Sequence, residues 1–398
     1  MHCNFIAPEV GITPTPVIDP AARVIYVLVR TSEGNRSGDP LLYQRLHALD
    51  LATGAEKPGS PVLIRASVKS STLFGLLPKQ VTFHSVLENP RAAMLLSGGH
   101  VYIAWGSACD VGPYHGWILS YDARTLRQTG VFNTSPDSDE SGIWQSDVGI
   151  AADRDGGVYA VTGNGVFDAA SGGRDFGDSV IKLALQNGAL SIRDYFTPFD
   201  QDYLNRTDKD LGASGPILLP DQSGAHPHLL ITGGKTGLMY LIDRDRMGKF
   251  QAGSNSHAVQ TIQTGTGTFG APAFWGGHLY TANRKDVLKD FALEQGRLTQ
   301  VPVHFGAFVF PHPGAIPSIS ANGVHDGIVW TVCSDGPRER GSSQVDSEAV
   351  FIASDAADVS RQLYFERLDR GLRFTMPLIA AGRVYIPARG KIYVYGLR

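Results

Sequence analysis

The chain has 398 residues, of which 42% are hydrophobic and 18% charged, and it holds 46 Gly and 23 Pro. This composition excludes a disordered chain, a coiled coil and collagen, and its many turn-forming residues are typical of a large β protein. The formal net charge is −3. With no long basic run in the sequence, this charge argues against nucleic acid as a partner.

The first ten residues, MHCNFIAPEV, hold neither the basic start nor the apolar stretch of a secretory signal. No apolar run approaches the roughly 20 residues that span a bilayer, so no membrane span is expected. The three cysteines, Cys3, Cys109 and Cys333, form no CxxC pair, which argues against a structural zinc site. A disulfide between Cys3 and Cys109 and a set of buried free thiols are both compatible with the sequence.

A unit of short strands separated by Gly, Asn and Asp turns recurs along the chain. Its first copy reads TPVID at 15–19, VIYVLV at 24–29 and RLHALDLATG at 45–54. Alternating apolar and polar residues predict strands here, and sustained helical periodicity is hard to find. The second strands of the successive units fall at 24–29, 101–106, 158–163, 229–234, 279–283, 328–333 and 384–390.

Each repeat has three or four strands, too few to bury both faces of its own sheet. Radial packing of successive sheets solves this problem, so the sequence predicts an all-β fold. We expect a single β-propeller domain over 1–398, with about seven visible four-stranded blades and residues 1–10 as an N-terminal arm. A stacked array of β-sandwiches is the weaker alternative, because no linker-like composition separates the repeats. The last repeat ends after its third strand.

The middle of the chain carries three motifs in a fixed order: SGIWQSDVGIAADRDGGVYAVTGNGVFD at 141–168, DLGASGPILL at 210–219 and GGKTGLMYLIDRD at 233–245. In this order they resemble quinoprotein alcohol dehydrogenases, and ALDLATGAEKP at 48–58 resembles the repeat of pyrroloquinoline-quinone (PQQ) propellers. Nearly the whole chain is similar to PQQ-like repeat proteins. The resemblance implies an eight-bladed propeller, here shortened at the N-terminus, from a periplasmic or extracellular family.

The resemblance also implies a site. Trp144 matches the indole on which the quinone stacks, and Lys235 matches the cation beside it. Asp110 and Asn164 match oxygen ligands of a calcium ion, which polarises the quinone carbonyl. Asp210 matches the general base that accepts the proton of the alcohol.

The sequence departs from the quinoprotein pattern in several places. It has no adjacent Cys-Cys pair, no matching Arg around residues 9–13 and none of the tryptophans that dock one blade on the next. We therefore expect a non-catalytic propeller that binds a small-molecule or protein ligand on its loop face. The alternative is a quinoprotein-like, calcium-assisted oxidoreductase acting on alcohols or sugars, with PQQ as its cofactor.

Each implied site residue also has a structural interpretation. Trp144 is compatible with a packed core position, Asp110 with a loop cap and Lys235 with a hairpin tip. Asn164 lies between two glycines, as in a turn at positive φ, and Asp210 lies in an exposed, turn-like run.

Two further patterns are candidates for metal binding. The acidic, Gly-rich loop at 168–179 would wrap a calcium ion through Asp175 and Asp178. His226 and His228 would share one face of a strand. A histidine site needs a third ligand, and the other candidates are scattered: His115, His304 and His312. Solvated loops and isolated imidazoles are the alternatives. We expect a monomer, although an unpaired blade edge would favour self-association.

Overall fold

The computed structural model describes residues 11–34, 41–71, 80–335, 347–388 and 390–396. The chain divides into two compact units. Unit 1 spans Met1–Gly212 and Gly248–Ser254, and unit 2 spans Ala213–Met247 and Asn255–Arg398. The expected N-terminal arm, residues 1–10, lies outside the described residues. A single domain over 1–398 stays a prediction.

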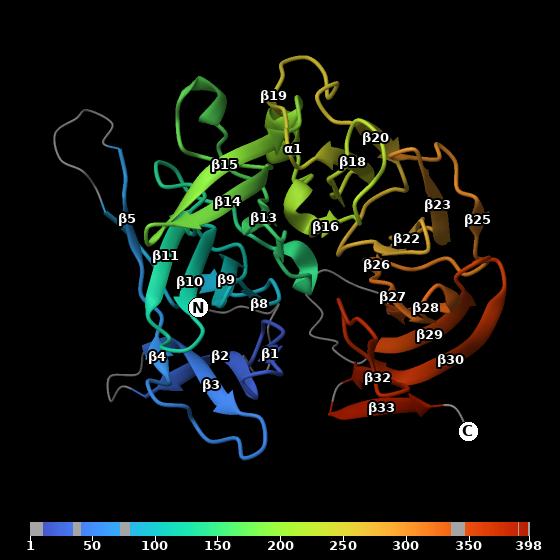
Figure 1. Ribbon diagram of the computed structural model, residues 1–398, viewed down its shortest axis with the longest axis horizontal. Helices are drawn as coiled ribbons and strands as arrows, with labels where there is room; N and C mark the ends of the chain where they lie inside the picture. Colours follow the sequence, from blue (N-terminus) through green and yellow to red (C-terminus); the bar gives the residue numbers. More distant parts are fainter. Residues whose placement is uncertain (1–10, 35–40, 72–79, 336–346, 389, 397–398) are drawn as a thin grey trace. The chain divides into compact units, whose positions relative to one another are not determined.

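Unit 1 contains three large sheets and one separate hairpin among its described residues, and all of its strand pairs are antiparallel except β15 with β19. Figure 1 shows its strands from blue to green, with β19 in yellow. The sheet orders are β1-β2-β3-β4, then β11-β10-β9 with β7 and β8 both on β9, then β12-β13-β14-β15-β19. The hairpin pairs β5 with β6. The strands are β1 (Val17–Asp19), β2 (Val24–Glu33), β3 (Leu41–Asp50), β4 (Val62–Leu63), β5 (Ser67–Lys69), β6 (Gln80–Thr82), β7 (Glu88–Asn89), β8 (Leu95–Ser97), β9 (His100–Ser107), β10 (Trp117–Asp122), β11 (Gln128–Asn133), β12 (Ala151–Ala152), β13 (Gly157–Val161), β14 (Val180–Gln186), β15 (Ala189–Thr197) and β19 (Lys249–Phe250).

Unit 2 contains four sheets in its described part. Their orders are β16-β17-β18-β20, then β21-β22-β23-β24 with β25 on β23 and β26 on β22, then β27-β28-β29-β30, then β31-β32-β33. The strands are β16 (Ile217–Leu218), β17 (Leu229–Gly233), β18 (Leu238–Asp243), β20 (Gln260–Gln263), β21 (Ala273–Trp275), β22 (His278–Asn283), β23 (Leu288–Glu294), β24 (Arg297–Leu298), β25 (His304–Phe305), β26 (Gly314–Ala315), β27 (Ser318–Asn322), β28 (His325–Asp335), β29 (Ser347–Asp355), β30 (Gln362–Gly371), β31 (Leu378–Ala380), β32 (Arg383–Ala388) and β33 (Lys391–Gly396).

The seven repeats read from the sequence are confirmed as seven consecutive sheets in the described chain. The last repeat, expected to end after its third strand, forms the three-stranded sheet β31-β32-β33 in the described chain. The expected four strands occur in three of the other sheets, whereas the remaining three have five or six. The expected apolar–polar alternation is also absent from the middle strands. Every residue of β13 and of β17 is buried, because both faces of a middle strand are covered by neighbouring elements.

The described helices are short. They are α1 (Gln201–Arg206) and the 3₁₀ turns η1 (Gln145–Asp147), η2 (Ala169–Ser171) and η3 (Leu211–Ala213). None of them is long and apolar enough to cross a membrane. No helical pattern marks α1 in the sequence, because six residues are too few to show a periodicity.

The connections between strands differ in length at the two ends of the unit 1 sheets. Strand direction alternates in an antiparallel sheet, so every second connection lies at the same end. At one end the turns are tight, with only Gly98 and Gly99 between β8 and β9 and only Asn187 and Gly188 between β14 and β15. At the other end the connections are long. We call these four segments the loop end of unit 1: residues 108–116, 134–150, 162–179 and 198–212.

The core of unit 2 gives a test of its packing. Ile231 is fully buried in β17, within a cluster that includes Leu241 and Phe291. We expect Ile231→Ala to lower the free energy of unfolding by about 2–5 kcal/mol, because it leaves a cavity. Val324, which is 76% exposed, supplies the control Val324→Ala. Urea unfolding would contradict this description if the two variants lost similar amounts of stability.

Candidate functional site

Buried hydrogen bonds connect the segments of the loop end of unit 1. The carboxylate of Asp210 accepts the backbone N–H of Asn164 at 2.9 Å. In the same way, Asp178 accepts the backbone N–H of Leu211 at 3.0 Å. The backbone N–H of Ser141 donates to the carbonyl of Asn164 at 2.6 Å. The connections that follow β11, β13 and β15 therefore form one interlocked structure.

Glycines permit this close approach. A Cβ on Gly177 would lie 2.0 Å from the carbonyl oxygen of Gly165, and a Cβ on Gly212 would lie 2.5 Å from the backbone nitrogen of Gly163. Both distances are shorter than any tolerated contact, so these two positions require glycine if the loops keep their present packing.

An aromatic pair lies within the loop end. The rings of Tyr114 and Trp144 meet edge to face, with centroids 6.0 Å apart and an interplanar angle of 82°. Trp144 is half-buried, and the Arg91 guanidinium lies over its ring at 5.5 Å. Tyr114 is buried. The indole therefore combines a packed position with partial access to solvent.

Four carboxylates act electrostatically on the Tyr114 hydroxyl. Burial raises the pKa of Tyr114 well above its ordinary value, and the four negative charges raise it further: Asp110, Glu140, Asp210 and Asp139. Burial likewise raises the pKa of Glu140, with further repulsion from Asp139, Asp110 and Asp210. Since Asp110 and Asp139 are exposed, the cluster extends from a buried tyrosine to the surface. We call these four residues the acidic cluster.

The backbone of the loop end is unusually strained. Seventeen non-glycine residues in the described chain have positive φ, and eight of them belong to the loop end. Conformations of this kind persist only where surrounding contacts enforce them, and they gather at functional sites. The eight residues are Cys109, Asp110, Glu140, Ser141, Gln145, Ser146, Asp178 and Asp208.

Four of the five implied site residues lie in the loop end: Asp110, Trp144, Asn164 and Asp210. Lys235 belongs to unit 2, in the turn between β17 and β18, as a hairpin tip predicts. The interpretation of Asp210 as an exposed turn residue is wrong, since it is 7% exposed. The expected positive φ at Asn164 is also wrong, and Gly165 has φ +156° instead.

The contacts of Asn164 and Trp144 bear on whether this site fits a calcium ion and PQQ. Asn164 Oδ1 is buried with no hydrogen-bond partner, while its Nδ2 donates to Asp208 at 3.2 Å. An orphaned amide oxygen of this kind is suited to a calcium ion. Among the described residues, however, no three His, Cys, Asp or Glu side chains are placed to hold a metal. Arg91 also lies over the indole on which a quinone would stack. Calcium and PQQ therefore stay predictions of the resemblance.

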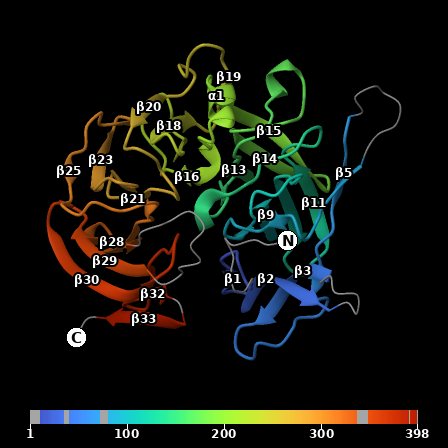
Figure 2. The same ribbon diagram turned by 180° about the vertical axis from the view of Figure 1, so that it is seen from behind.

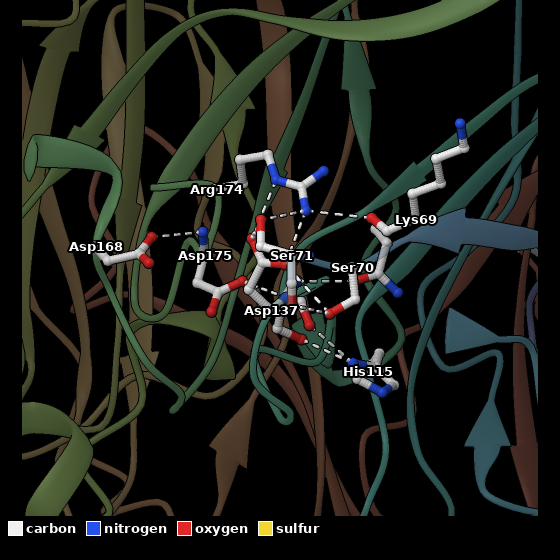
Figure 3. Close-up of polar contacts among 10 residues, drawn as sticks. Lys69, Ser70, Ser71, His115, Asp137, Asp168, Arg174 and Asp175 are labelled. Atoms are coloured by element: carbon white, nitrogen blue, oxygen red, sulfur yellow. Dashed lines mark hydrogen bonds and ion pairs between the residues drawn. The ribbon is translucent and has the colours of Figure 1, made fainter. Parts of the chain in front are cut away.

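The acidic loop at 168–179 turns its carboxylates toward backbone donors. Asp168 accepts the N–H of Asp175 at 2.8 Å, and Asp175 accepts the N–H of Asp137 at 3.0 Å (Figure 3). Asp175 and Asp178 are 2% and 0% exposed. Asp175, through Asp137, and Asp178, through Leu211, therefore each have a structural role in ordering the loops.

The histidines occupy separate places. Nδ1 of His226 bonds Asp243 and Nδ1 of His228 bonds Asp245, each at 2.7 Å. Both histidines precede β17, so the expectation that they lie on a strand is wrong. The remaining three have other neighbours: His115 bonds the Ser135 carbonyl, His304 bonds Asp290, and His312 meets Phe269 edge to face.

The cysteines differ in state. Cys109, at the loop end, is disulfide-bonded, whereas Cys333 is a buried free thiol. Cys3, the other half of the disulfide considered from the sequence, lies outside the described residues.

Sequence reasoning missed one buried acid beside the loop end. Glu88, in β7, is 1% exposed, and both its carboxylate oxygens lie 3.3 Å from the backbone N–H of His115. Burial raises the pKa of Glu88 to about 8. The effect of burial is larger than the opposite effects of the His115 N–H and of the Arg30 charge, which lower the pKa. No local pattern marks this residue, because its environment is made by segments distant in sequence.

No protein-family model and no curated protein matches the chain. Solved structures do resemble it. BamB from Moraxella catarrhalis, a PQQ-like β-propeller, matches with a TM-score of 0.51 and 13% identity, over 97% of this chain and 83% of that one. The C-terminal WD40 domain of Sif2 matches with a TM-score of 0.51 and 11% identity, over 97% and 82%.

The quinohemoprotein alcohol dehydrogenase ADHIIG from Pseudomonas putida HK5 matches with a TM-score of only 0.45 and 15% identity, over 94% of this chain and 56% of that one. At such identities these matches concern the fold alone. WD40 domains are β-propellers. The BamB and Sif2 matches confirm the predicted all-β propeller fold, with seven sheets in the described chain.

The role of Asp210 in the loops is testable. Asp210→Ala would leave the backbone N–H of Asn164 without its acceptor, at an expected cost of about 1–3 kcal/mol in unfolding free energy. Asp210→Asn keeps an oxygen at that position and should cost much less. Urea unfolding of the two variants measures the difference. Equal losses would mean that the hydrogen bond does not stabilise the loops.

The pKa of Glu88 predicts a dependence of stability on pH. Its folded value of about 8 lies above the ordinary 4.5, so the folded state binds more protons between these pH values. The free energy of unfolding should therefore fall as pH rises, by roughly 3 kcal/mol from about pH 5 to about pH 8. Glu88→Gln should remove this component, whereas Glu294→Gln, at an exposed position, should keep it. Parallel pH slopes for wild type and Glu88→Gln would contradict the assignment.

Proposed function

We propose that the protein is a non-catalytic β-propeller that binds a basic peptide segment of a partner at the loop end of unit 1. The observation that carries this proposal is the acidic cluster beside a half-buried indole. Carboxylates and an aromatic face together are the groups that recognise guanidinium and ammonium side chains.

Electrostatics favours a cation at this place. The pKa of Glu140 is raised by burial and by three neighbouring carboxylates, which means that their negative charges repel one another. A bound cation would relieve this repulsion. No ion pair of Asp139 or Glu140 occurs among the described residues. Asp139 is exposed, so a basic side chain can reach it from solvent. Such complementarity contributes to specificity and to the rate of association.

The indole supplies the second element of recognition. Arg91 already lies over the Trp144 ring at 5.5 Å, so this ring accepts a guanidinium neighbour within the protein itself. An incoming arginine would use the remaining accessible part of the ring. The interlocked loops fix these groups before binding, which reduces the entropy lost when the complex forms.

The experiment measures binding of a fluorescein-labelled tetra-arginine peptide by fluorescence anisotropy. We expect saturable binding that weakens with salt. Asp139→Asn together with Glu140→Gln should weaken it by roughly threefold to tenfold, since one exposed and one half-buried charge contact are lost. Asp155→Asn together with Glu294→Gln removes the same charges at exposed positions outside the loop end and should leave binding unchanged.

Equal weakening by both double variants would show attraction to net charge alone and would reject the site. The oxidoreductase alternative is tested separately, by adding PQQ and Ca²⁺ and measuring dye-linked oxidation of alcohols and sugars. Dye reduction that requires both additions would overturn the proposal of a non-catalytic protein.

A further inference from the structure

An uncharged segment forms one edge of the second sheet of unit 2. Strand β25 pairs with β23, Phe305 lying opposite Lys289 and His304 opposite Asp290. Strand β22 occupies the other side of β23, and both views show β25 outside β23 (Figures 1 and 2). No further strand pairs with β25 in the described chain. The segment at 301–309 is therefore the last layer of this sheet among the described residues.

Exposed and half-buried residues alternate along this segment, and every exposed residue is apolar. Val301 is 70% exposed, Phe305 63% and Val309 59%. Single apolar residues are normal on a protein surface, whereas several gathered in one place mark an interaction site. We call these five exposed residues the apolar row: Val301, Val303, Phe305, Ala307 and Val309.

Hydrogen bonds and aromatic contacts hold the inner side of the segment. The backbone N–H groups of Val303 and Gly306 donate to carbonyl groups of β23, each at 2.8 Å. The ring of Phe308 meets that of Phe310 at 5.2 Å and that of Phe365, in β30, at 6.1 Å. Because these contacts occupy the inner side, the apolar row is left on the outer side of the segment.

Charged side chains do not protect this edge. Residues 298–325 contain no Asp, Glu, Lys or Arg, although these types make up 18% of the chain. Strand β30, at the end of the next sheet, differs because Arg367 and Asp369 are exposed along it. Charges on edge strands usually prevent association with another chain. The segment at 301–309 lacks this protection, so it is suited to an intermolecular contact.

We propose that the apolar row packs against the same row of a second copy of this chain. The two rows run antiparallel, with Phe305 at the two-fold axis. Val301 of each copy then faces Val309 of the other, and Val303 faces Ala307. A two-fold interface requires a self-complementary surface. The row meets this requirement, since its order Val-Val-Phe-Ala-Val is nearly the same in both directions from Phe305.

Charge and size both agree with a second copy as the occupant. Identical chains carry identical charges, and no charged side chain belongs to the row to repel its counterpart. Contact through the row would bury on the order of 1,000 Å² in total, near the lower limit for specific interfaces. We therefore expect a weak dimer. This proposal departs from the monomer expected from the sequence, and it is independent of the peptide site because the row belongs to unit 2.

The test measures sedimentation velocity of the full-length protein over roughly 1–200 µM, where a weak dimer dissociates. We expect reversible, concentration-dependent dimerisation. Phe305→Asp should raise the dissociation constant at least about tenfold, because two carboxylates would meet at the axis. Ile392→Asp is the matched control and should leave dimerisation unchanged, since Ile392 is 65% exposed on β33, at the end of the last sheet.

A pair of variants tests the antiparallel register. Val301→Asp and Val309→Lys should each weaken the dimer when studied alone. An equimolar mixture of the two should associate more tightly than either, because a mixed dimer places the new carboxylate opposite the new ammonium group. At its other end the mixed dimer keeps the original contact of Val309 with Val301. Circular dichroism establishes that each variant is folded before association is compared.

Three results would overturn the proposal: a monomer at every concentration, equal weakening by Phe305→Asp and Ile392→Asp, or a mixture that associates no better than the single variants. Flotation with phosphatidylcholine vesicles tests a different occupant. Vesicle binding by a monomeric wild type that is lost in Phe305→Asp would assign the row to a lipid surface, and would likewise overturn the proposal.

Discussion

The loop end of unit 1 depends on two buried carboxylates that accept backbone N–H groups from a neighbouring segment. Asp178 holds Leu211, and Asp210 holds Asn164. Long connections without regular structure carry backbone donors that must find partners once they are buried. By supplying those partners, the two aspartates hold the connections at 162–179 and 198–212 together. Strained backbone such as that of Glu140 persists because this packing leaves it no alternative.

The hydrogen bond from Asn164 also bears on the predicted role of Asp210 as a general base. Asp210 is buried, and one of its carboxylate oxygens accepts a backbone hydrogen bond. Within the acidic cluster, Asp110 and Asp139 are exposed and Glu140 is half-buried. The role of Asp210 as a general base stays a prediction of the resemblance.

The sequence was sufficient for the fold because strands are encoded locally. Segments such as Val24–Glu33 combine β-branched residues with flanking turns, and every repeat has its counterpart sheet in the described chain. The resemblance also brought Trp144 and Asn164 to one end of one unit. It could not reveal the properties of Tyr114 or of Glu88. Their properties arise from burial and from neighbours distant in the chain, which leave no mark in a window of adjacent residues.

Strand β19 limits how the polypeptide can be cut into fragments that match the two units. It lies in the short segment Gly248–Ser254, which belongs to unit 1 although the residues on either side of it belong to unit 2. Through Lys249 and Phe250 it pairs in parallel with Phe196 and Thr197 of β15. A fragment cut at Gly212 would lack this strand and would expose the edge of β15 to other chains. The two units are therefore distinct in packing but inseparable by a single cut of the polypeptide.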